Sequence, residues 1–223
     1  MKTGIESLLA AALIALGYGV VVAYLGQKRR SELSWKALKP GTRSRILYLV
    51  IATGINAATV FCFRRFYPEY GLLHQCKLIV LINLLIASAA VDYRLYKIPN
   101  PFLLVGLGLR AVFYIIEFAQ SVSAAWEGMK GDLLAAGILM AFFLLIAAIF
   151  KGSVGMGDIK LMGIMGLYQG VWGSANAVFY SMLMAFFLSI ALMILKKKTR
   201  NDTIAFGPCI MLGTAVSIML TGI

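Results

Sequence analysis

Long apolar runs, separated by short polar gaps, most limit what this chain can fold into. We predict eight of them, at residues 5–25, 46–63, 76–91, 102–119, 133–150, 158–172, 174–195 and 204–223. An α-helix needs about 20 apolar residues to cross a bilayer. Because 61% of the 223 residues are hydrophobic and only 13% are charged, the chain cannot cover itself with a polar surface. We expect an all-α integral membrane protein, a bundle of about eight transmembrane helices.

The basic residues are unevenly distributed among the gaps. The chain has 21 lysines and arginines against nine acids, a net charge of +12. Fifteen of the basic residues fall in alternate gaps, at residues 27–45, 92–100, 151–160 and 196–203. Cytoplasmic loops are enriched in Lys and Arg, so these gaps are predicted to face the cytoplasm. We therefore expect a multi-pass plasma-membrane protein with both termini outside, in which the charge sets topology and indicates no nucleic-acid partner.

The N-terminal run is predicted to be a retained span. Its basic cluster follows the apolar residues, whereas a signal peptide carries its charge before them. We divide the chain into residues 1–75, two helices joined by the basic cytoplasmic loop 27–45, and residues 76–223, a six-helix core. The basic loop is too short to be a domain.

Two aspartates lie at the predicted cytoplasmic side of the core. Asp92 ends the third run, and Asp158 begins the sixth within the stretch Gly-Met-Gly-Asp-Ile-Lys. An acid at the centre of a membrane helix costs roughly 2.5–3.5 kcal/mol, so it indicates function. Runs three and six are short, which predicts irregular backbone below the headgroups, lining a wet cavity.

Two close carboxylates can hydrolyse a peptide bond. Like charges at short range cannot both ionise freely, so the pair shares one proton and serves as both base and acid. The roles belong to the pair and not to either residue. The three cysteines are far apart and His74 is the only histidine, so we expect no metal site and no cofactor.

Each of these acids also has a purely structural interpretation. Asp92 is explained equally well as a helix-end acid paired with Arg94 or Lys97, and Asp158 as a helix N-cap. Lys160 either extends to the cytoplasmic headgroups or tunes Asp158 electrostatically. The presence of both acids on one face, beside Gly and Pro residues, favours function.

Three other polar or turn features allow simple structural interpretations. Asp132 is expected to be an N-cap on the outer side, after a loop at residues 121–131. Arg110 must face the bundle or extend toward the interface. The stretch from Phe206 to Pro208 is either a helix start or a wall of the cleft.

Three blocks of the sequence resemble the type IV prepilin peptidases, which are GxGD intramembrane aspartyl peptidases. The first is Asp92 followed by Ile98-Pro99-Asn100, and the second is Gly155–Gly166, GMGDIKLMGIMG. The third is Ile204–Gly213, IAFGPCIMLG, where Ala205 replaces the usual proline. The blocks occur in the family's order.

The resemblance implies an aspartic endopeptidase with catalytic residues Asp92 and Asp158. It implies a supporting cleft formed by Gly155, Gly157, Lys160, Pro99, Asn100, Gly207 and Pro208. The implied substrate is a prepilin or pseudopilin with a short basic leader and a hydrophobic helix, cleaved at the cytoplasmic membrane face. The lipid bilayer is the other partner, and the oligomeric state is left open.

Larger members of the family carry a cysteine-rich zinc domain between the first two spans and also methylate the new N-terminus. Here that gap contains no cysteine. We therefore expect no N-methyltransferase activity and a resemblance to the compact members that serve Flp/Tad-type pili. The alternative function is a proton- or cation-coupled transporter using intramembrane carboxylates. No internal repeat favours it, and both acids lie at span ends.

Overall fold

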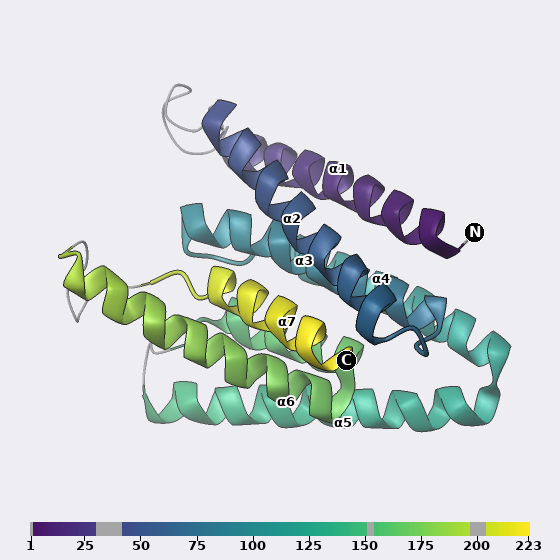
Figure 1. Ribbon diagram of the computed structural model, residues 1–223. Helices are drawn as coiled ribbons and strands as arrows, with labels where there is room; N and C mark the ends of the chain where they lie inside the picture. The colour runs from purple at the N-terminus through teal and green to yellow at the C-terminus, as the bar shows by residue number, and fades with distance from the viewer. Residues whose placement is uncertain (1, 30–41, 151–153, 197–203) are drawn as a thin grey trace.

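The structure is a computed structural model that describes residues 2–29, 42–150, 154–196 and 204–223 (Figure 1). Regular secondary structure in these ranges is entirely α-helical. The helices are α1 (Lys2–Arg29), α2 (Thr42–Phe66), α3 (Leu72–Leu95), α4 (Asn100–Gln120), α5 (Val122–Ile149), α6 (Met156–Ile194) and α7 (Gly207–Thr221). Six of them, α1 to α6, are long and apolar enough to cross a membrane. The all-α membrane fold is confirmed.

Helix α6 contains both the sixth and the seventh predicted runs. Gly170 interrupts it with φ 64° and ψ −168°, a conformation essentially restricted to glycine, and divides it into two arms. The first arm packs on α5, where Gly166 lies against the backbone of Ala136. The second packs on α7, where the backbone of Ser181 lies against Gly213. The seven helices therefore supply the eight expected helical segments.

Two predicted boundaries are wrong. The expected loop at residues 121–131 is helical from Val122, and α5 continues through Asp132, which is consequently not an N-cap. Glycines and charges suggested a loop, but the Ala, Glu, Met and Lys residues in this stretch favour helix. Helix α3 is also longer than its apolar run, with 24 residues. At 1.5 Å per residue it reaches about 36 Å, so the expected short third span is incorrect.

Helix α3 is the centre of the bundle. It packs against α1, α2, α4, α6 and α7, and most of its residues are buried. The amides of Asn56 on α2 and Asn83 on α3 hydrogen-bond reciprocally, at 3.2 and 2.9 Å. Polar pairs of this kind join helices in a membrane, where no water competes for them. In Figure 1, α1 and α2 lie on one side of α3, and α5 lies on the opposite side.

The bundle has two polar ends. At one end, His74 contacts the carbonyl of Gly222 at 3.0 Å, and Gln169 donates to the carbonyl of Ile223 at 2.9 Å. The other end holds the end of α3 and the starts of α4, α6 and α7, which contact one another through Asp92 and Gly157. Most of the expected basic loop 27–45, and residues 197–200 of the basic turn, lie outside the described residues.

Candidate active site

Asp92 is buried in the last turn of α3, against the start of α7. Its Oδ2 accepts a hydrogen bond of 2.9 Å from the backbone N–H of Gly207. A Cβ added at Gly207 would lie 2.9 Å from the same oxygen, so the close approach requires glycine. Gly207 is the first residue of α7, and the N-terminus of a helix favours negative charge. The third sequence block thus supplies a hydrogen-bond donor to the acid of the first.

Asp158 lies in the first turn of α6 and is half-buried. The N-cap of this helix is Gly155, and Asp158 hydrogen-bonds back to the Gly155 backbone, as the third residue of a capping box does. Its Oδ1 is buried and has no hydrogen-bond partner within the described ranges. One carboxylate oxygen therefore orders the helix start, and the other remains available to a polar ligand.

The structure brings the first and second blocks into contact. The Asp92 and Asp158 carboxylates are close enough to interact electrostatically. Gly157 lies against Ile98, with only 3.0 Å between an added Cβ and the Cβ of Ile98. Lys160 donates a 3.3 Å hydrogen bond to Oδ1 of Asn100, the first residue of α4. The lysine therefore ties α6 to α4 in this structure.

Comparison with known proteins identifies the family of this chain. The profile of the Type IV leader peptidase family matches residues 79–190, half of the chain, and this range includes both aspartates. The chain belongs to the Type IV leader peptidase family. It is also similar to the prepilin leader peptidase/N-methyltransferase of Bacillus subtilis (strain 168), with 33% identity over 141 residues.

The alignment with this relative covers 63% of the chain and 54% of the relative, so the chain spans about half the length of its curated relative. No solved structure matches the chain. The chain thus belongs to a prepilin peptidase family, whose members are aspartic proteases. It also has several helices that are long and apolar enough to cross a membrane. The family match ends before Gly207, so the contact between α7 and Asp92 comes from the structure alone.

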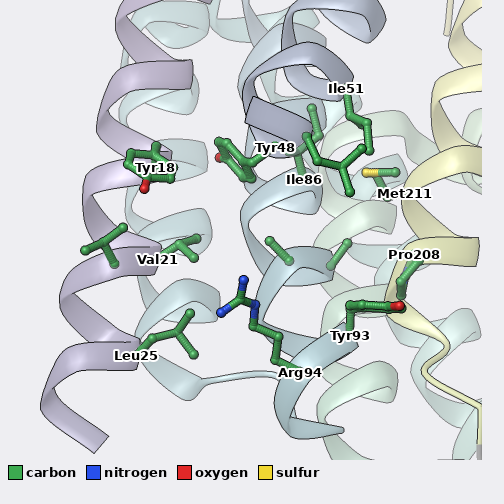
Figure 2. A pocket seen from close by; sticks show the side chains of 14 residues that line it. Tyr18, Val21, Leu25, Tyr48, Ile51, Ile86, Tyr93, Arg94, Pro208 and Met211 are labelled. Carbon is green, nitrogen blue, oxygen red and sulfur yellow. The ribbon is translucent and has the colours of Figure 1, made fainter. Parts of the chain in front are cut away.

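An apolar cavity of about 410 Å³ lies at the end of α3 that carries Asp92 (Figure 2). Helices α1, α2, α3 and α7 line it, and Pro208 from the predicted cleft is part of its wall. Tyr93 and Arg94 from α3 also line it, next to Asp92 in the chain. This cavity differs from the wet one expected at the aspartates: its walls are mostly apolar and come from segments that are far apart in the sequence.

The remaining predicted cleft residues lie around the same end of the bundle. Pro99 is buried, has an extended backbone and is the N-cap of α4. Its neighbour Asn100 is exposed and contacts Lys160. The seven predicted supporting residues thus fall into two groups. Gly155, Gly157, Lys160, Pro99 and Asn100 surround the start of α6, and Gly207 and Pro208 form the start of α7.

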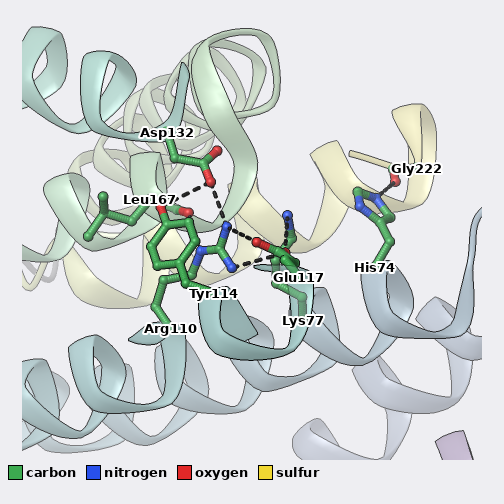
Figure 3. A network of polar contacts seen from close by, with 8 residues as sticks. All are labelled: His74, Lys77, Arg110, Tyr114, Glu117, Asp132, Leu167 and Gly222. Atoms are coloured by element: carbon green, nitrogen blue, oxygen red, sulfur yellow. Dashed lines mark hydrogen bonds and ion pairs between the residues drawn. The ribbon is translucent and has the colours of Figure 1, made fainter. Parts of the chain in front are cut away.

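A second polar cluster, which we call the Arg110 network, is buried away from Asp92 and Asp158 (Figure 3). The Arg110 guanidinium contacts Asp132 at 2.6 Å and both oxygens of Glu117 at 3.1 Å. Its Nε donates to the carbonyl of Leu167 at 2.7 Å, in the last turn of the first α6 arm, where carbonyls lack helical donors. Of the two predicted positions for Arg110, the structure shows the one facing the bundle.

The Arg110 network also explains the position of Asp132. Its Oδ2 accepts hydrogen bonds from Arg110 and from the hydroxyl of Tyr114, at 3.1 Å. Lys77 on α3 lies 4.0 Å from Glu117 and adds a second positive charge to balance the second acid. The network joins α3, α4, α5 and α6. An internal arginine was the only sequence signal for it, and its acidic partners could not be inferred without the fold.

Proposed function

We propose that this protein is an intramembrane aspartic endopeptidase in which Asp92 and Asp158 form the catalytic dyad. The observation that carries this proposal is the meeting of three distant sequence blocks at one end of the bundle. There Gly157, beside Asp158 in α6, packs against Ile98 of the first block, and Gly207 from α7 donates to Asp92. Family membership supports the same chemistry.

The dyad holds one proton between two carboxylates. The ionised group removes a proton from a water molecule, and the water oxygen attacks the carbonyl carbon of the scissile peptide bond. The shared proton passes to the leaving nitrogen as the C–N bond breaks. The products are a new carboxyl terminus and a new amine, and the dyad again holds a single proton.

The proposed substrate is a prepilin or pseudopilin, including the Flp/Tad type, with a basic leader followed by an apolar helix. The similarity to the Bacillus subtilis prepilin leader peptidase/N-methyltransferase supports this substrate class. We propose cleavage at the cytoplasmic face, because the dyad end also carries Arg94, Lys97 and Lys160. We propose no methyl transfer, because the gap between the first two spans lacks cysteines.

The test uses the purified full-length chain and a prepilin-like substrate, with cleavage followed by the change in gel mobility. Asp92→Asn and Asp158→Asn keep the side-chain shape and remove the titratable group, so each is expected to abolish cleavage. Glu127→Gln is the matched control, since Glu127 is exposed on α5. Wild-type cleavage rates in either dyad variant would refute the dyad. The same reaction with a methyl donor is expected to yield an unmethylated product by mass spectrometry.

A further inference from the structure

The apolar cavity is lined by residues that neighbour Asp92 and Gly207 in the chain. Tyr93 follows Asp92, and Pro208 follows Gly207, which is the residue that donates to Asp92. Ala89 forms part of the cavity wall and lies three residues before Asp92, so both fall on one face of α3, about one turn apart. A peptide bond held at Asp92 therefore lies within about one helical turn of this cavity.

The cavity is large enough for bulky apolar side chains. A dry cavity of about 150 Å³ holds a benzene-sized group, and this one measures about 410 Å³. Its walls include Val21, Leu25, Ile51, Ile86, Ala89 and Met211. In Figure 2 the labelled apolar side chains among these, together with Tyr18 and Tyr48, face a common space between α1, α2, α3 and α7. The space has room for about two ring-sized groups.

Charge decides which half of the substrate fits. Figure 2 shows the Arg94 guanidinium in the space between α1 and α3. No acidic side chain among the described residues lines the cavity to attract a basic leader, whereas the apolar walls suit the segment after the scissile bond. This reasoning rests on the proposed peptidase function. We propose that the cavity binds the bulky apolar side chains that follow the scissile bond and thereby selects the substrate.

The test changes the size of the cavity and of the substrate side chain together. Ala89→Phe reduces the cavity, and Met211→Ala enlarges it. Each variant is assayed in detergent with two synthetic prepilin-like substrates that differ only in the residue after the cut, Phe or Ala. We expect Ala89→Phe to lower the Phe-to-Ala cleavage ratio about tenfold or more. We expect Met211→Ala to leave this ratio unchanged or raise it.

Ala148→Phe is the size-matched control, because Ala148 is exposed on α5, away from the cavity. It is expected to keep the wild-type ratio. Equal losses on both substrates in Ala89→Phe would overturn the inference and assign the cavity to a lipid chain or to packing. If Ala89→Phe fails to fold, Ala90→Val decides, because it also narrows the cavity, and an unchanged ratio in this variant overturns the inference. Absence of wild-type cleavage would instead refute the proposed function.

Discussion

The backbone amide of Gly207 lies 2.9 Å from Oδ2 of Asp92, although 115 positions separate the two residues in the sequence. This hydrogen bond fixes the start of α7 against the end of α3. It also places the helix N-terminus, with its partial positive charge, at a buried acid. The third sequence block thus acts by positioning a backbone donor, and its side chains need not take part in the chemistry.

Substituting Gly207 is expected to disable the peptidase. In Gly207→Ala the new Cβ would lie 2.9 Å from Oδ2, so the carboxylate must move. A misplacement of about 1 Å costs roughly 100-fold in rate, and we expect a loss of that order in prepilin cleavage. Gly131→Ala on α5 is the control, because an added Cβ there has no neighbour within 4 Å. Equal rates in the two variants would show that the contact is dispensable.

The hydrogen bond between Lys160 and Asn100 is expected to matter little. It is exposed and 3.3 Å long, and exposed polar pairs contribute about 0–1 kcal/mol. Lys160→Met and Asn100→Leu should each lower cleavage by less than about fivefold. Because each substitution removes the same hydrogen bond, the double variant should cleave about as fast as the slower of the two single variants. If the rate losses of the two single variants instead multiply in the double variant, the two residues act separately.

Removing Arg110 is expected to destabilise the bundle. Arg110→Met leaves Asp132 buried without its cation, and breaking a buried pair costs about 3–5 kcal/mol. Unfolding in detergent measures the loss. Lys130→Met is the control, since its pair with Glu127 is exposed and worth about 0–1 kcal/mol.

The double variant Arg110→Met/Asp132→Leu should recover part of that stability. It removes the unpaired acid, while Glu117 keeps Lys77 within 4.0 Å. A double variant less stable than Arg110→Met would contradict the explanation by an unpaired buried charge.

Gly170 is expected to tolerate no side chain. Its φ of 64° and ψ of −168° cost other residues about 1–3 kcal/mol, so Gly170→Ala should lower the unfolding free energy by that amount. Gly108→Ala on α4 has no neighbour within 4 Å and should be neutral or slightly stabilising. A melting temperature unchanged by Gly170→Ala would argue against the division of α6 at this residue.

The proposed orientation can be tested by cysteine labelling. After replacement of Cys62, Cys76 and Cys209, single cysteines are placed at Lys97, near the dyad, and at Glu127, near the start of α5; both native side chains are exposed. An impermeant maleimide should label Glu127→Cys in intact cells and Lys97→Cys only after permeabilisation. The reverse pattern would place the dyad outside the cytoplasm.

The sequence by itself determined the class of fold and the candidate acids. Hydropathy is a local property, so the apolar runs located the helices, although they put the start of α5 eleven residues late, at 133 and not at Val122. The spacing of residues within each block, such as Asp92 to Pro99, is also local and identified the family.

Only the tertiary structure decided which residues meet. The contact of Gly207 with Asp92, the ion pairs of Arg110 and the apolar cavity join residues from different helices. Such contacts depend on how each helix is rotated and shifted against its neighbours. Many packing arrangements are compatible with the same apolar runs, and close packing of α3 within the bundle selects one of them.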